Sequence, residues 1–131
     1  MTWRDRAEVQ AWWALSASDL RVARVVFALQ PPEWHVACFH AQQAAEKALK
    51  AVLEARELPV PRTHDLALLA QRLEEVGPVG EIAEASMRLS LYGVGPQYPG
   101  PSGDANEGNA RVAIADALAI CRWSERVLDG E

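Results

Sequence analysis

Six polar side chains between residues 40 and 64 have the chemistry needed to hold an anion. They are His40, Gln43, Lys47, Lys50, Arg62 and His64. Lysine, arginine and protonated histidine form charge-assisted hydrogen bonds with phosphate oxygens, and a glutamine amide adds a neutral donor. This set therefore predicts a binding site for a nucleotide or a nucleic-acid phosphate.

The first four of these residues belong to one helical segment, which is predicted to run from about Glu33 to Arg56. At 100° per residue they lie within about 80° of one another, together with Glu54 and opposite a stripe of alanines. Two interpretations stay open. The face either binds an anion, or it is an ordinary solvated surface on which Lys50 pairs with Glu54 four residues later.

Arg62 and His64 follow in a loop that Pro59 and Pro61 make stiff. Thr63 is the predicted N-cap of the next helix, and free backbone N–H groups at the start of a helix attract anions. The bend can bring Arg62 and the start of that helix back toward the lysines of the preceding helix. The loop is therefore predicted to complete the anion site.

Three other kinds of site fit the sequence poorly. The Gly-rich stretch Gly93–Gly103 lacks the GK[ST] ending of a P-loop, so a crossover loop between helices is expected there. His35, Cys38 and His40 do not all share one helix face, so no metal and no cofactor are expected. Cys38 and Cys121 both lie on apolar helix faces, which predicts buried and unreactive thiols.

Apolar residues recur at three- and four-residue spacing along the chain, which predicts an all-α fold. Asp19 falls within the apolar face of the first helical segment, so we expect it to pair with a lysine or arginine of the second or the last helix. Short connections favour an up-and-down antiparallel bundle of four to five helices, in a single domain over residues 1–131. The expected segments are about Trp3 to Leu29, Glu33 to Arg56, Thr63 to Val76, Glu81 to Tyr92, and a last helix opened by a capping box of Asp104 and Glu107.

The composition indicates a globular protein, with 131 residues, half of them hydrophobic, and a net charge of −5. This net negative charge argues against a protein that binds along nucleic acid by charge alone. The charged N-terminal sequence and the lack of an apolar run of about 20 residues predict a soluble, cytoplasmic protein without a membrane anchor. Trp12, Trp13, Trp34 and Trp123 are expected in the core or in an interface. So many apolar anchors predict a homodimer or a higher homo-oligomer.

The run from Phe39 to Leu69, FHAQQAAEKALKAVLEARELPVPRTHDLALL, resembles the HEPN domain of bacteria and archaea. The YPG segment at Tyr98–Gly100, the alanine-rich last helix, and Asp19-Leu20 in the first helix fit the same family. The resemblance implies a compact bundle of four or five helices that dimerises. It also implies pairing with a minimal nucleotidyltransferase, commonly as a toxin–antitoxin system, and binding of nucleotide or RNA.

Many HEPN proteins are metal-independent ribonucleases, which are marked by an arginine, four to six residues, and then a histidine. This sequence departs from that signature, because seven residues separate Arg56 from His64 and a single residue separates Arg62 from it. Gln97 also stands where many relatives carry an arginine before the Tyr-Pro pair. The sequence therefore predicts a binding or interaction module. The alternatives are a ribonuclease that uses His64 with Arg62, and a purely structural oligomeric scaffold.

Overall fold

The computed structural model describes residues 2–93 and 104–130, and these residues form helices without any strand. The predicted all-α fold is confirmed. The α-helices in the described ranges are α1 (Ala7–Phe27), α2 (Trp34–Ala55), α3 (Leu66–Arg72), α4 (Gly80–Ser90) and α5 (Glu107–Leu128). Short 3₁₀ turns occupy Trp3–Asp5, Leu73–Glu75 and Leu91–Gly93. The Gly-rich stretch, with Gln97 and Tyr98–Gly100, lies almost entirely outside the described residues.

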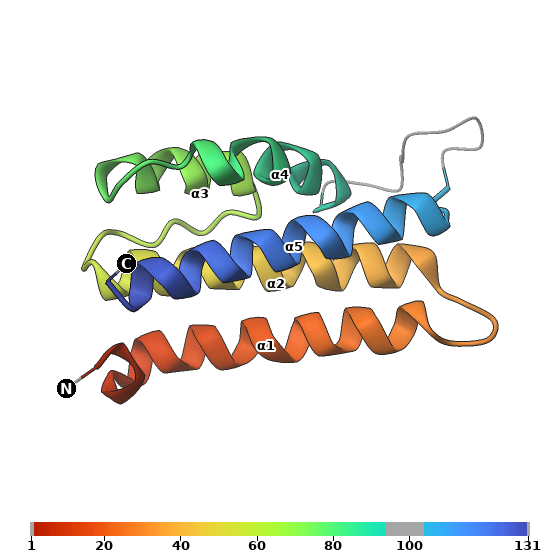
Figure 1. Cartoon of the computed structure of the whole chain (residues 1–131), viewed down its shortest axis with the longest axis horizontal. Coiled ribbons are helices and arrows are strands. Elements are labelled where there is room, and N and C mark those ends of the chain that lie inside the picture. Colours follow the sequence, from red (N-terminus) through yellow and green to blue (C-terminus); the bar gives the residue numbers. More distant parts are fainter. Residues whose placement is uncertain (1, 94–103, 131) are drawn as a thin grey trace.

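Helix α2 is the centre of the bundle. It packs against α1 and α5, and α3 and α4 form a further layer that contacts both α2 and α5 (Figure 1). The alanine stripe of α2 faces these neighbours, and small side chains allow helix axes to approach closely. Its fully buried alanines are Ala37, Ala41, Ala44, Ala45, Ala48 and Ala51.

The helices do not simply alternate in direction. α1 and α2 run antiparallel, and so do α4 and α5, as predicted (Figure 1). α2 and α5 are also neighbours, yet they run in the same direction. The segment from residue 56 to residue 65 passes back along the bundle before α3 begins, so α3 and α4 separate the two central helices in sequence.

Trp3 connects the N-terminal segment to the C-terminal end of α5. The Trp3 indole N–H donates a hydrogen bond of 2.8 Å to Asp129, and the Trp3 ring packs edge-on against Trp13 with 5.4 Å between centroids. Trp123 is buried in the main core, and Trp34 packs against that core with Phe27. Trp12 and Trp13 are partly buried and pack against a smaller cluster. These tryptophans therefore lie in or against the hydrophobic clusters, in agreement with the predicted core or interface positions.

Two predicted helix starts are wrong. Asp65, not Thr63, is the N-cap of α3, and its carboxylate accepts hydrogen bonds from the backbone N–H groups of Ala67 and Leu68. At α5 the capping box is formed by Asn106 and Asn109 instead of Asp104 and Glu107. Aspartate, asparagine and threonine are all good N-cap residues, so propensity alone does not decide between the two candidates in either place.

The described helices do not include one with the length and apolarity needed to cross a membrane.

Candidate functional site

Asp19 joins α1 to α2 through two bonds. Its Oδ2 atom lies 2.5 Å from the Nζ atom of Lys47, and its Oδ1 atom lies 2.8 Å from Nδ1 of His40. His40 and Lys47 are seven residues apart, so they share one face of α2 two turns from each other. The Asp19 side chain is only 13% exposed and that of Lys47 is 20% exposed. The predicted pairing of Asp19 with a lysine of the second helix is confirmed.

Glu46 holds a second lysine and a second histidine. Lys50 Nζ lies 3.1 Å from Glu46 Oε2, and both side chains are buried. Oε1 of the same carboxylate lies 2.7 Å from Nδ1 of His64 in the loop before α3. The Lys50 ammonium also lies 5.5 Å from the centroid of the Trp12 ring on α1. Glu46 therefore links α2 to the loop and, through Lys50, to α1.

The sequence interpretation did not consider Glu46, and it named Glu54 as the partner of Lys50 only if this face were an ordinary solvated surface. The signal was nevertheless present, because a glutamate four residues before a lysine is the more favourable order on a helix. In the structure the backbone carbonyl of Glu54 accepts a hydrogen bond of 3.2 Å from Arg6, and Lys50 bonds to Glu46 instead. Lys50 therefore bonds to Glu46 and not to Glu54, the partner that the solvated-surface interpretation gave it.

Two glutamines fix the loop against α2. The buried Gln42 donates a hydrogen bond of 2.9 Å from its amide to the backbone carbonyl of His64. Gln43 in turn donates to the Gln42 side-chain oxygen at 2.7 Å. Gln43 thus has a positioning contact within the protein, at the place where the sequence predicted contact with a ligand.

The predicted anion site is only partly assembled. Lys50 and His64 meet at Glu46, and His40 and Lys47 meet at Asp19, so each lysine has a carboxylate beside it. Arg62 is exposed and forms no ion pair with any described residue. The backbone N–H groups that open α3 are already bonded to the Asp65 side chain. An anion would therefore have to compete with carboxylates for the lysines.

The two cysteines are poor nucleophiles. Both are buried, as predicted, and burial raises the pKa of Cys38 to about 11. Burial also raises the pKa of Cys121, while a hydrogen bond with Ser16 and the charge of Arg24 act in the opposite direction. A thiol with a raised pKa stays protonated at neutral pH, and the thiolate is the reactive form.

A third ion pair joins α4 to α5 on the far side of the bundle. The Arg88 guanidinium donates two hydrogen bonds of 2.8 Å to the two oxygens of Asp116, which is buried. These bonds and the carboxylate charge raise the pKa of Arg88. Two parallel hydrogen bonds fix the position of Arg88 on α4 relative to Asp116 on α5. The sequence interpretation did not predict this ion pair.

The histidines of the described residues have carboxylates as their charged neighbours. Within residues 2–93 and 104–130, His40 and His64 bond to carboxylates and His35 lies 4.0 Å from Glu33, and no arginine is hydrogen-bonded to a histidine. The same residues contain no group of three His, Cys, Asp or Glu side chains that could hold a metal ion.

Comparison with known families gives a match to the HEPN domain over residues 9–127. The chain belongs to the HEPN domain family. The match extends from α1 into α5 and confirms the resemblance of the segment from Phe39 to Leu69.

Two solved structures share the fold. The first is TT1696 from Thermus thermophilus, with a TM-score of 0.79 and 29% sequence identity; the match covers 91% of this chain and 97% of that one. The second is ST0689, an archaeal HEPN homologue, with a TM-score of 0.76 and 25% identity; the match covers 92% of this chain and 97% of that one. A comparison with curated proteins gives no match.

Proposed function

We propose that this HEPN domain is a non-catalytic interaction module. It forms a homodimer or a higher homo-oligomer and pairs with a minimal nucleotidyltransferase, as in a toxin–antitoxin system. The family supplies the expected partner class. The observation that carries the proposal is an apolar outer surface on α1, next to the face of α2 whose charges are already paired.

A strip of the outer surface of α1 is apolar, beside the exposed Arg21 and Arg24. Leu15 is 49% exposed and Val25 is 57% exposed, and Val22 lies between them on the same helix face. Phe39 of α2 is 46% exposed and packs edge-on against His40, which is bonded to Asp19 of α1. Phe39 therefore adds an exposed aromatic ring on α2, beside the histidine that bonds α1. Exposed apolar surface of this kind is typical of a protein-binding face.

Substitution of Val25 tests this surface. Val25→Glu places a charge on it and should shift the protein toward the monomer in sedimentation equilibrium. Met87→Glu is the matched control, because Met87 is 62% exposed on α4, away from α1. If both variants keep the mass of the parent, this surface is not the interface. If both dissociate, the effect is not specific to α1.

Binding of a nucleotide or of RNA is the second candidate function. Arg62 and His64 are exposed in the loop before α3, and His64 lies beside the buried pair of Glu46 and Lys50. Titration with ATP and with a short RNA at two salt concentrations tests this function, because phosphate contacts weaken as salt rises. Arg62→Ala with His64→Ala should abolish such binding, and unchanged affinity would contradict it. Metal-independent RNA cleavage that His64→Ala abolishes would instead favour the ribonuclease alternative.

A further inference from the structure

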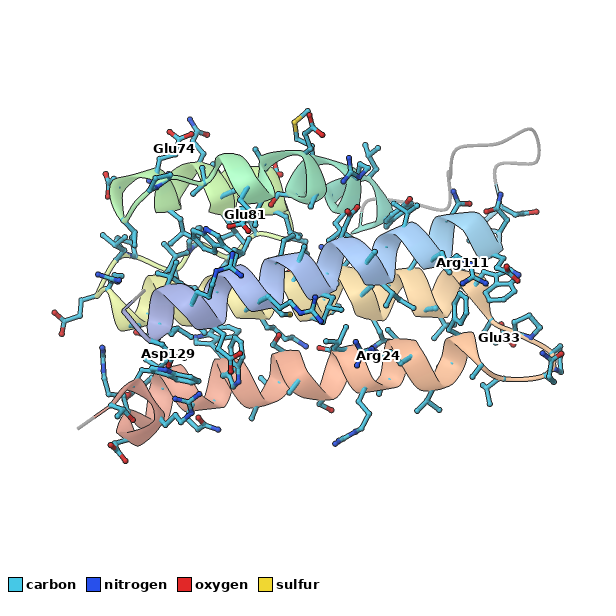
Figure 2. The ribbon with its side chains drawn as sticks, viewed as in Figure 1. Arg24, Glu33, Glu74, Glu81, Arg111 and Asp129 are labelled. Carbon is cyan, nitrogen blue, oxygen red and sulfur yellow. The ribbon has the colours of Figure 1, made fainter. Side chains whose placement is uncertain are left out.

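A pocket lies between α1 and α5, at the end of the bundle where α1 meets the start of α2. Its volume is about 290 Å³, and Arg24, Phe27, Arg111 and Ile114 line it. Figure 2 shows Arg24 and Arg111 on the two helices that border this region. None of the residues that line the pocket belongs to the predicted anion site.

The floor of the pocket is aromatic and held in place. The Phe27 ring packs against Trp34 with 5.2 Å between centroids, and both rings pack against the main core. The Arg111 guanidinium lies 5.1 Å from the centroid of the Phe27 ring. A cation over an aromatic ring is attracted to it, so Arg111 is oriented before any ligand arrives. Ile114, one turn later on α5, adds an apolar wall.

The described residues that line the pocket include two arginines and no acidic side chain. Arg24 forms no ion pair with any described residue. Its positive charge acts on the buried Cys121 thiol, whose pKa it lowers. Arg111 has one carboxylate partner, Glu107, at 2.9 Å, and both side chains are more than half exposed. Exposed pairs of this kind are weak, and a guanidinium has five N–H donors, so Arg111 can bond a second anion.

We propose that this pocket binds a small organic anion, in which a carboxylate or phosphate is attached to an aromatic or aliphatic body. The two guanidiniums would hold the acidic group, since arginine matches the geometry of carboxylate and phosphate. Phe27 and Ile114 would cover the apolar body. The volume lies near the lower limit for small-molecule sites, which favours a ligand of modest size.

Ligand-observed saturation-transfer NMR on the whole protein tests the ligand class. The probes are benzoate and phenyl phosphate, with benzamide as the neutral analogue and inorganic phosphate as the anion without an apolar body. We expect saturable binding of benzoate, phenyl phosphate or both. Benzamide lacks the negative charge and inorganic phosphate lacks the ring, so each should bind at least about tenfold more weakly. Equal binding of benzamide, or no saturable binding of benzoate and phenyl phosphate, would overturn the proposal.

Matched substitutions locate the site. Arg24→Gln and Arg111→Gln should each raise the dissociation constant of the bound probe by about tenfold. Arg122→Gln is the control, because Arg122 is exposed on the same face of α5, about 16 Å farther along the helix from Arg111. It should leave the dissociation constant unchanged. Circular dichroism confirms that each variant is folded. If Arg122→Gln weakened binding as much as Arg24→Gln and Arg111→Gln, or if neither of the latter two weakened it, the probe would bind elsewhere.

Discussion

Nδ1 of His64 lies 2.7 Å from Oε1 of Glu46, although the two residues are eighteen positions apart in the chain. The bond ties the loop before α3 to a buried carboxylate in the middle of α2. Lys50 shares that carboxylate, so one acidic side chain fixes a loop, a helix face and a buried ammonium group. Glu46 is therefore a structural centre of the region where ligand binding was predicted.

Glu46→Ala should lower the free energy of unfolding by about 3 kcal/mol, because it leaves the buried Lys50 without its carboxylate. Glu54→Ala is the matched control, since Glu54 was the other candidate partner of Lys50, and it should cost less than about 0.5 kcal/mol. Urea denaturation measures both. A larger loss for Glu54→Ala than for Glu46→Ala would contradict the observed pairing.

Asp19→Ala should destabilise the protein by more than about 1 kcal/mol, because Lys47 and His40 would both lose a partly buried partner. Glu74→Ala removes an exposed carboxylate from the turn after α3 and should have almost no effect. The same denaturation measurement compares them. An unchanged midpoint for Asp19→Ala would show that the α1–α2 contact does not depend on this network.

Asp116→Ala should cost about 1 kcal/mol or more, since it removes both hydrogen bonds that Arg88 donates across α4 and α5. Arg88 is about half exposed, which limits the contribution of the pair through solvent screening. A double-mutant cycle with Arg88→Ala measures the coupling. Additive losses in the double variant would show that the two side chains do not stabilise each other.

The cysteines give a prediction on pH. The pKa of Cys38 rises from 9.0 to about 11 through burial, so the folded protein keeps the thiol proton after the unfolded chain has lost it. The free energy of unfolding should therefore fall as pH rises from 9 to 11, and Cys38→Ala should show a smaller fall. A thiol reagent should also modify both cysteines much faster in denaturant. Rapid modification of the native protein at neutral pH would contradict their burial.

The sequence predicts the helices well because their apolar spacing is regular and prolines or glycines separate them. Exact helix starts were harder to predict, because Thr63 and Asp65 both have side chains suited to an N-cap and only the folded backbone shows which one caps α3. The shared direction of α2 and α5 could not be read from the sequence, since it depends on the path of the loop between α2 and α3.

The candidate site was predicted less completely than the fold. The sequence places His40 and Lys47 on one face, and it indicates that Asp19 needs a partner, yet spacing alone does not show that these three meet. The bond between His64 and Glu46 depends on the return of the loop to α2. Arg24 and Arg111 come from helices at opposite ends of the chain, so their common pocket required the structure.

Sedimentation equilibrium of the unaltered protein at micromolar concentration tests the central proposal of an interaction module most directly. The chain has a mass of 14.4 kDa, and the apolar surface of α1 with Phe39 predicts a species at least twice that mass. A single species of 14.4 kDa across the concentration range would contradict self-association through this surface.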